Sequence, residues 1–162
     1  MYKVAIITAS DKGYAGERED KSGSVIEEIV TAHELEVTGK VILPDDRQML
    51  SDQMLNYCHQ GIDLILTTGG TGFSKRDVTP EATADIVERR ADNLTFAMIA
   101  NSLQYTPKAM LSRGIAGIHE NTLIVNLPGS PKAVRENLEY AIDAIIHGVK
   151  ILKGDDAECA RK

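Results

Sequence analysis

A single polar segment, residues 67–80 with the sequence TTGGTGFSKRDVTP, carries residue types that bind phosphate. Three glycines within residues 69–72 allow backbone N–H groups to converge on a bound anion. Hydroxyl and cationic side chains extend through the same segment at Thr67, Thr68, Thr71, Ser74, Lys75 and Arg76. The spacing fits neither a Walker A loop nor a dinucleotide fingerprint. A tight turn needs only about four residues, so this longer polar segment favours an anion-binding site.

Asp77 lies in this segment and allows two interpretations. Thr79 is predicted to be the N-cap of a helix with Pro80 as its first residue, and Asp77 could simply complement that helix terminus. Alternatively, Asp77 binds a metal beside phosphates, since Mg²⁺ is usually held by one or two carboxylates plus substrate oxygens. Asp45 has the same ambiguity, because it could form a capping box with Gln48 or act as a catalytic carboxylate.

A second anion site is predicted within residues 126–132, sequence NLPGSPK. Ser130 is expected to cap the final helix with Pro131 at its first position, which leaves free backbone donors at the helix terminus. Lys132 and Arg135 would strengthen this site through their charge. A well-capped helix without a ligand would explain the same residues.

The loop at residues 10–23 is longer and more highly charged than a simple connection between a strand and a helix. It is interpreted either as part of the site or as a disordered lid.

Composition restricts the class of protein. The chain has 162 residues, 43% of them hydrophobic and 26% charged, which is typical of one globular domain. A net charge of −6 argues against a nucleic-acid partner, and the absence of a long apolar run argues against a membrane span. The cysteines and histidines show no metal-ligand spacing. Cys58 is predicted to be a buried structural thiol, and Cys159 to lie in a frayed tail.

Short apolar runs predict the strands of a parallel sheet, because strands buried on both faces are almost continuously apolar. The expected strands are residues 3–8, 35–43, 62–68, 115–118 and 123–127.

Helical periodicity predicts the elements between these strands. Ser24, with Glu27 as a capping box, is expected to open the first helix, and Asp45 or Asp46 the second. The final helix has apolar residues on one face from Val134 to Val149.

This alternation of strands and helices predicts one doubly wound α/β domain, residues 1–154, with a tail at 155–162 that we expect to be disordered. Ligands of such folds bind at the carboxyl ends of the strands. The loops expected there are residues 9–22, 44–48, 69–80 and 128–132, which hold most of the polar and glycine residues of the chain.

The motifs described above resemble the molybdopterin adenylyltransferase family, the Mog-type domain of molybdenum cofactor biosynthesis that is shared with gephyrin. The likeness rests on residues 67–80 and 126–131, and on four shorter matches: Ser10-Asp11, DKSG at 20–23, Pro44-Asp45 and LSR at 111–113. It extends over nearly the whole chain, and the long glycine-containing motif is highly specific.

The resemblance implies a three-layer α/β fold with a mostly parallel central sheet, a homotrimer and a cytoplasmic enzyme. It implies transfer of AMP from ATP to the terminal phosphate of molybdopterin with Mg²⁺, and delivery of the product to a molybdenum-insertion protein. Asp45 and Asp77 match the essential aspartates and would bind the metal. The residues expected to bind substrate or nucleotide are Ser10, Asp11, Asp20, Ser22, Thr68, Gly69, Gly70, Thr71, Gly72, Ser112, Arg113, Asn126, Pro128, Gly129 and Ser130.

The chain departs from the family pattern at Phe96 and Ile99, where a Glu and an Arg are often found. Tyr105 and Lys108 nearby are further candidates for substrate binding. Two other functions stay open: a paralogue that binds molybdopterin without catalysis, and a domain like that of nicotinamide-nucleotide-processing competence proteins. The latter usually carries a second, deamidase domain, for which a chain of 162 residues has no room.

Overall fold

The computed structural model describes residues 1–155, and its centre is a six-stranded sheet in the order β2-β1-β3-β6-β5-β4. Strands β1, β2, β3 and β6 run parallel, β5 is antiparallel to β6, and β4 is antiparallel to β5. The bounds are β1 Lys3–Ala9, β2 Glu36–Leu43, β3 Leu64–Thr68, β4 Arg89–Arg90, β5 Ala116–His119 and β6 Thr122–Leu127. The predicted mostly parallel sheet is therefore confirmed.

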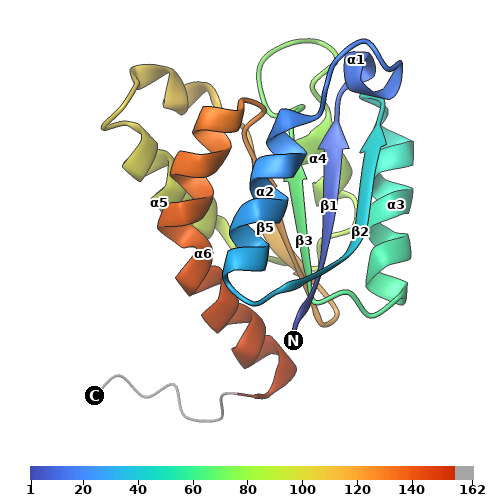
Figure 1. The fold of residues 1–162 in the computed structure, drawn as a ribbon, viewed down its shortest axis with the longest axis vertical. Helices are drawn as coiled ribbons and strands as arrows, with labels where there is room; N and C mark the ends of the chain where they lie inside the picture. The colour runs from blue at the N-terminus through green and yellow to red at the C-terminus, as the bar shows by residue number, and fades with distance from the viewer. Residues whose placement is uncertain (156–162) are drawn as a thin grey trace.

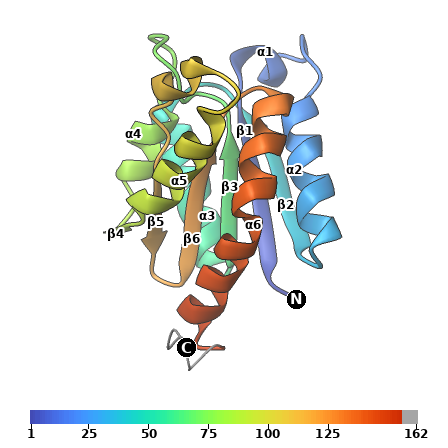
Figure 2. The same ribbon diagram turned by 90° about the vertical axis from the view of Figure 1, so that its left-hand side faces the viewer.

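Helices cover both faces of this sheet, as Figures 1 and 2 show. One face packs against α2 (Lys21–Ala32), α5 (Asp92–Ser102) and α6 (Pro131–Lys153). The other packs against α3 (Arg47–His59) and α4 (Thr79–Ala84). Side chains of β1 alternate between the two layers: Val4 and Ile6 lie in the first core, Ala5 and Ile7 in the second. Burial on both faces explains the continuous apolar run in β1 and confirms the three-layer fold.

Helices α2 and α4 begin at residues other than those predicted. Asp20, not Ser24, caps α2, because the Asp20 side chain lies one residue before the helix and accepts from Gly23 N. Ser24 lies inside the helix and donates to Asp20 O. In α4 the cap position belongs to Val78, which makes no side-chain cap bond, so Thr79 is already helical.

The caps of α3 and α6 can be compared with the predictions made for them. Asp46 caps α3 by accepting from Met49 N, so Asp45 forms no capping box with Gln48, whose side chain bonds to Asp52. Ser130 caps α6 as predicted, accepting from Ala133 N ahead of Pro131.

Several short elements were not predicted from periodicity: α1 (Asp11–Tyr14), β4, α5 and the 3-10 turn η1 (Pro107–Leu111). Because α1 lies within residues 10–23 and is capped by Ser10, the interpretation of that loop as a disordered lid is wrong. Cys58 is buried as predicted. Cys159 and residues 156–162 of the predicted tail lie outside the described residues. No helix within residues 1–155 has the length and apolarity needed to cross a lipid bilayer.

Candidate active site

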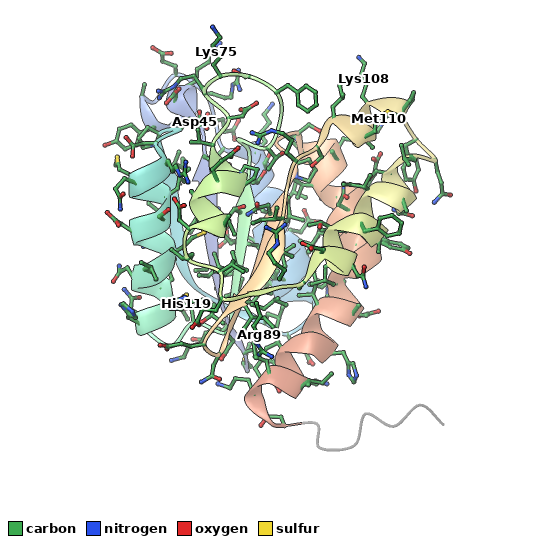
Figure 3. All side chains as sticks on the ribbon, turned by 180° about the vertical axis from the view of Figure 1, so that it is seen from behind. Asp45, Lys75, Arg89, Lys108, Met110 and His119 are labelled. Atoms are coloured by element: carbon green, nitrogen blue, oxygen red, sulfur yellow. The ribbon has the colours of Figure 1, made fainter. Side chains whose placement is uncertain are left out.

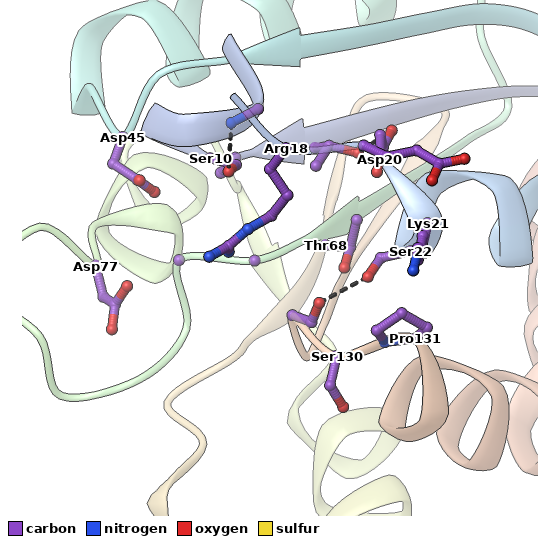
Figure 4. Close-up of a pocket in the computed structure, with 17 residues that line it drawn as sticks. Ser10, Arg18, Asp20, Lys21, Ser22, Asp45, Thr68, Asp77, Ser130 and Pro131 are labelled. Carbon is purple, nitrogen blue, oxygen red and sulfur yellow. Dashed lines mark hydrogen bonds between the residues drawn. The ribbon is translucent and has the colours of Figure 1, made fainter. Parts of the chain in front are cut away.

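The parallel strands β1, β2, β3 and β6 all end at one edge of the sheet, at the top of Figure 1, and the loops that follow them meet there. These loops enclose a cavity of about 790 Å³, which we call the first cavity (Figure 4). The predicted site residues that line it are Ser10, Asp20, Ser22, Asp45, Thr68, Gly69, Gly70, Asp77, Gly129 and Ser130. The rule that ligands of doubly wound sheets bind at this edge therefore located a real cavity.

A second cavity of about 430 Å³ adjoins the first, on the side of α5 and η1. The predicted site residues lining only this cavity are Thr71, Gly72, Ser112 and Pro128. Lys108 also lines it, as does Ile99, whereas Phe96 is 71% exposed and Tyr105 lines neither cavity. Three residues belong to both linings: Gly70, Asp77 and Gly129. The glycine loop is thus a wall shared by two spaces.

Asn126 lines neither cavity and instead binds other parts of the protein. Its Oδ1 accepts from Ile115 N at 3.1 Å, and its Nδ2 donates to Thr67 Oγ1 and Thr83 Oγ1 at 2.9 and 3.0 Å. Asn126 is only 3% exposed. Its amide therefore fastens the end of β3 and helix α4 to the strands β5 and β6.

Arg113 also lines neither cavity, and it supports the glycine loop from behind. Its guanidinium donates to Gly72 O at 2.8 Å and Asp77 O at 2.9 Å, and it forms an ion pair with Glu81. Two carbonyl groups of the loop are thereby held in place. Arg113 fixes the backbone that carries the candidate site residues.

Asp11 and Asp45 join the loops after β1 and β2 by two reciprocal hydrogen bonds. Asp11 N donates to Asp45 Oδ2 at 3.1 Å, and Asp45 N donates to Asp11 Oδ1 at 3.0 Å. Arg76 from the glycine loop donates to both oxygens of Asp11 at 2.9 Å. These hydrogen bonds from Arg76 hold the pKa of Asp11 below its usual value. Arg76 is therefore occupied by Asp11 and does not reach into the cavity as the sequence suggested.

Asp45 is electrostatically destabilised. Burial raises the pKa of Asp45 above its usual value, and the negative charges of Asp11 and Asp77 act in the same direction. Its Oδ1 is buried and forms no hydrogen bond with the described part of the chain; the same is true of Thr79 Oγ1. A β-carbon on Gly70 would lie 2.3 Å from Thr79 Oγ1 and 3.2 Å from Asp45 Oδ1. With φ of 69° as well, this position requires glycine.

Asp77 closes its own loop by accepting from Ser74 N at 3.0 Å through Oδ2. It does not complement the α4 terminus through a side-chain cap, since that helix has none. Asp77 and Asp45 both line the first cavity. No group of three or more His, Cys, Asp or Glu side chains within residues 1–155 could hold a metal by itself. Two carboxylates, one of them with an unpaired oxygen, fit Mg²⁺ completed by substrate phosphates.

Anion-binding groups surround the same cavity. The N-terminal ends of α2 and α6 both face it, at Lys21-Ser22 and Ser130-Pro131, and supply partial positive charge. The hydroxyls of Ser22 and Thr68 hold the wall together by donating to Gly129 O and Pro128 O at 2.6 and 2.7 Å.

The cationic side chains differ from those expected. Lys132 does not line either cavity, and Arg135 forms ion pairs with Glu28 and Glu139, so neither strengthens the anion site as predicted. Lys75 lies at the outer tip of the glycine loop (Figure 3) and lines neither cavity. The cations that do line the first cavity are Arg18 and Lys21. Sequence reasoning missed both, although their place in the charged loop after β1 was a usable signal.

Fold and site together define a doubly wound α/β protein whose cavity, lined by glycines, helix N-termini and cations, lies at the carboxyl edge of its parallel strands. The family described as "Probable molybdopterin binding domain" matches residues 5–147, and the chain belongs to this family. The resemblance seen in the sequence motifs is therefore confirmed.

Curated relatives and a solved structure agree with this assignment. Molybdopterin adenylyltransferase of Helicobacter pylori J99 is 37% identical over 155 residues, which cover 94% of this chain and 88% of that protein. Gephyrin of Dictyostelium discoideum is 40% identical over 159 residues, but the match spans only 22% of gephyrin. The crystal structure of the molybdopterin biosynthesis enzyme MoaB from Thermus thermophilus superposes with a TM-score of 0.90 at 42% identity, covering 95% of this chain and 98% of that one.

Proposed function

We propose that this chain is a molybdopterin adenylyltransferase of molybdenum cofactor biosynthesis, which transfers AMP from ATP to the terminal phosphate of molybdopterin and releases pyrophosphate. The names of the relatives that cover most of the chain support the assignment. The structural observation that carries it is the shared wall of Gly70, Asp77 and Gly129 between two cavities. A reaction between the phosphates of two substrates needs two adjoining spaces that meet at anion-binding groups.

The residues of the site suit this chemistry because no general base is needed. The terminal phosphate of molybdopterin is already ionised, so its oxygen can bond to the α-phosphorus of ATP while the bond to the leaving pyrophosphate breaks. The protein has to align the two anions and neutralise their charge. Backbone N–H groups of the glycine loop and the N-termini of α2 and α6, which line the first cavity, would do so.

Asp45 and Asp77 would hold Mg²⁺, which when bound neutralises phosphate charge. The remaining contacts orient these two carboxylates. Asp11 N engages Asp45 Oδ2, which leaves Oδ1 facing the space beside Gly70. Arg113 fixes the Asp77 carbonyl, and Ser74 N fixes its carboxylate.

We further propose, from the family resemblance, that the chain forms a homotrimer in the cytoplasm and passes its product to a molybdenum-insertion protein. Its net charge of −6 gives no support to a nucleic-acid partner.

Incubation of the protein with molybdopterin, ATP and Mg²⁺ tests the function. We expect pyrophosphate and an AMP-linked pterin in equal amounts, with neither formed when EDTA is present. Asp46→Asn is a matched control, because it removes a charge beside Asp45 outside both cavities while asparagine preserves the helix cap. Pterin binding without either product would instead support the non-catalytic paralogue.

A further inference from the structure

Arg18 extends into the first cavity from the loop between α1 and α2 (Figure 4). Within residues 1–155 its side chain forms neither a hydrogen bond nor an ion pair. Five other arginines each pair with a carboxylate: Arg47, Arg76, Arg90, Arg113 and Arg135. Arg18, by contrast, presents to the cavity a guanidinium that is bonded to no carboxylate of residues 1–155.

Three of the four carboxylates that line the first cavity have hydrogen-bond partners other than Arg18. Asp20 accepts from Gly23 N and from Thr8 Oγ1, both at 2.9 Å. Asp45 accepts from Asp11 N, and Asp77 from Ser74 N. The fourth acidic residue of the lining, Glu19, is exposed and forms neither a hydrogen bond nor an ion pair with Arg18, so the guanidinium is available. An arginine presents a planar set of N–H donors that matches two phosphate oxygens at once.

We propose that Arg18 is a substrate-binding residue that donates paired hydrogen bonds to a phosphate group in the first cavity. The identity of the reaction rests on the proposed function, whereas the binding of phosphate does not. When the bond between the α-phosphorus and the bridging oxygen breaks, that oxygen keeps both electrons, and the leaving pyrophosphate gains negative charge. A guanidinium beside it stabilises this charge, while the new phosphorus–oxygen bond forms to molybdopterin.

The first test is the binding of inorganic pyrophosphate, measured by titration calorimetry on the whole chain. Arg18→Gln should weaken binding by about tenfold or more, the range for a lost charge-assisted hydrogen bond. Arg18→Lys keeps the charge but not the planar donors, so its loss should be smaller. Arg89→Gln is the matched control: Arg89 is exposed, lines neither cavity and lies at the opposite end of the molecule (Figure 3). Its affinity should equal that of the wild type.

Steady-state kinetics then identify which phosphate is bound. A rise in KM for ATP, or a fall in kcat, assigns Arg18 to the nucleotide phosphates; a rise confined to KM for molybdopterin assigns it to the terminal phosphate of the pterin. Equal pyrophosphate affinity of Arg18→Gln and wild type, with unchanged KM for both substrates, overturns the proposal. Absence of pyrophosphate binding by the wild type also overturns it. If the wild type binds pyrophosphate but makes no AMP-linked pterin, the proposed function fails, and the calorimetry still decides the role of Arg18.

Discussion

Replacing Asp45 by asparagine should make the metal-free protein more stable, although Asp45 is a proposed Mg²⁺ ligand. Asp45 Oδ1 is buried without a hydrogen bond to the described residues, and burial raises the pKa of this carboxyl. The ionised side chain therefore destabilises the native state at neutral pH. Asparagine can still accept from Asp11 N, and its uncharged amide places a donor on the side of Thr79 Oγ1, which is also unpaired.

The magnitude follows from the cost of an unsatisfied buried polar group, about 1–3 kcal/mol. Asp45 is partly exposed, so solvent screening favours the lower end, about 1 kcal/mol. For a chain of this length, that free energy corresponds to a rise in Tm of about 2–4 °C. Because the pKa is raised in the native state, the destabilisation is complete above the native pKa. It vanishes below the unfolded pKa, which is about 4. The difference in Tm between Asp45→Asn and the wild type should therefore be largest at pH 7 and disappear as the pH falls to about 4.

Thermal unfolding followed by circular dichroism in EDTA measures this difference. Asp46→Asn removes the same charge from the exposed neighbouring residue and should change the free energy of unfolding by less than about 0.5 kcal/mol. Addition of Mg²⁺ and ATP should raise Tm for the wild type but not for Asp45→Asn. A lower Tm for Asp45→Asn than for the wild type at pH 7 would refute the reasoning, because it would mean that the charge at Asp45 stabilises the fold.

Gly70→Ala puts a β-carbon 2.3 Å from Thr79 Oγ1 at a residue with φ of 69°. We expect the free energy of unfolding, measured in urea, to fall by about 1–2 kcal/mol, and pyrophosphate binding measured by calorimetry to weaken. Asp77→Asn retains an acceptor for Ser74 N, so Tm should stay within about 2 °C while AMP transfer falls by about 10²-fold or more; near-normal turnover at a lowered Tm would assign Asp77 to loop structure alone. Asn126→Ala removes the hydrogen-bond partner of Ile115 N and Thr67 Oγ1, and one of the partners of Thr83 Oγ1. This change should cost about 1–3 kcal/mol, while the folded fraction keeps its KM for both substrates. Light scattering at micromolar concentration should give the mass of a trimer, and a monomer would contradict that expectation.

The sequence predicted the elements whose burial follows a simple period. Strands β1, β3 and β6 are apolar on both faces, and α6 has one long apolar face, so these elements were found with nearly correct bounds. Most of the region between 85 and 115 was missed for physical reasons. Strand β4 has only two residues. Helix α5 has no clear amphipathic pattern, because Met98 is buried while Phe96 on the same helix is 71% exposed.

The position of the candidate site was predictable from topology, but the orientation of individual side chains was not. The same residue types lie in the cavity and behind it: Asp45 lines the first cavity, whereas Asp11 beside it is held by Arg76. Asn126 belongs to a specific motif, yet its amide forms three hydrogen bonds with residues of distant segments and does not reach the cavity. Such partners depend on how the loops pack, which no local pattern encodes. The charge of the loop after β1 was a usable signal for a site there, but this exposed loop has no periodicity that would single out Arg18.

The wall formed by Gly70, Asp77 and Gly129 has a consequence for inhibition and for turnover. A molecule that joins the two ligands across this wall gains the contacts of both cavities but loses its translational freedom once, so the second half binds at an effective concentration of roughly millimolar. A bisubstrate compound should therefore bind far more tightly than either half. The adenylylated pterin is itself such a compound. Its departure would then limit turnover more than bond formation does.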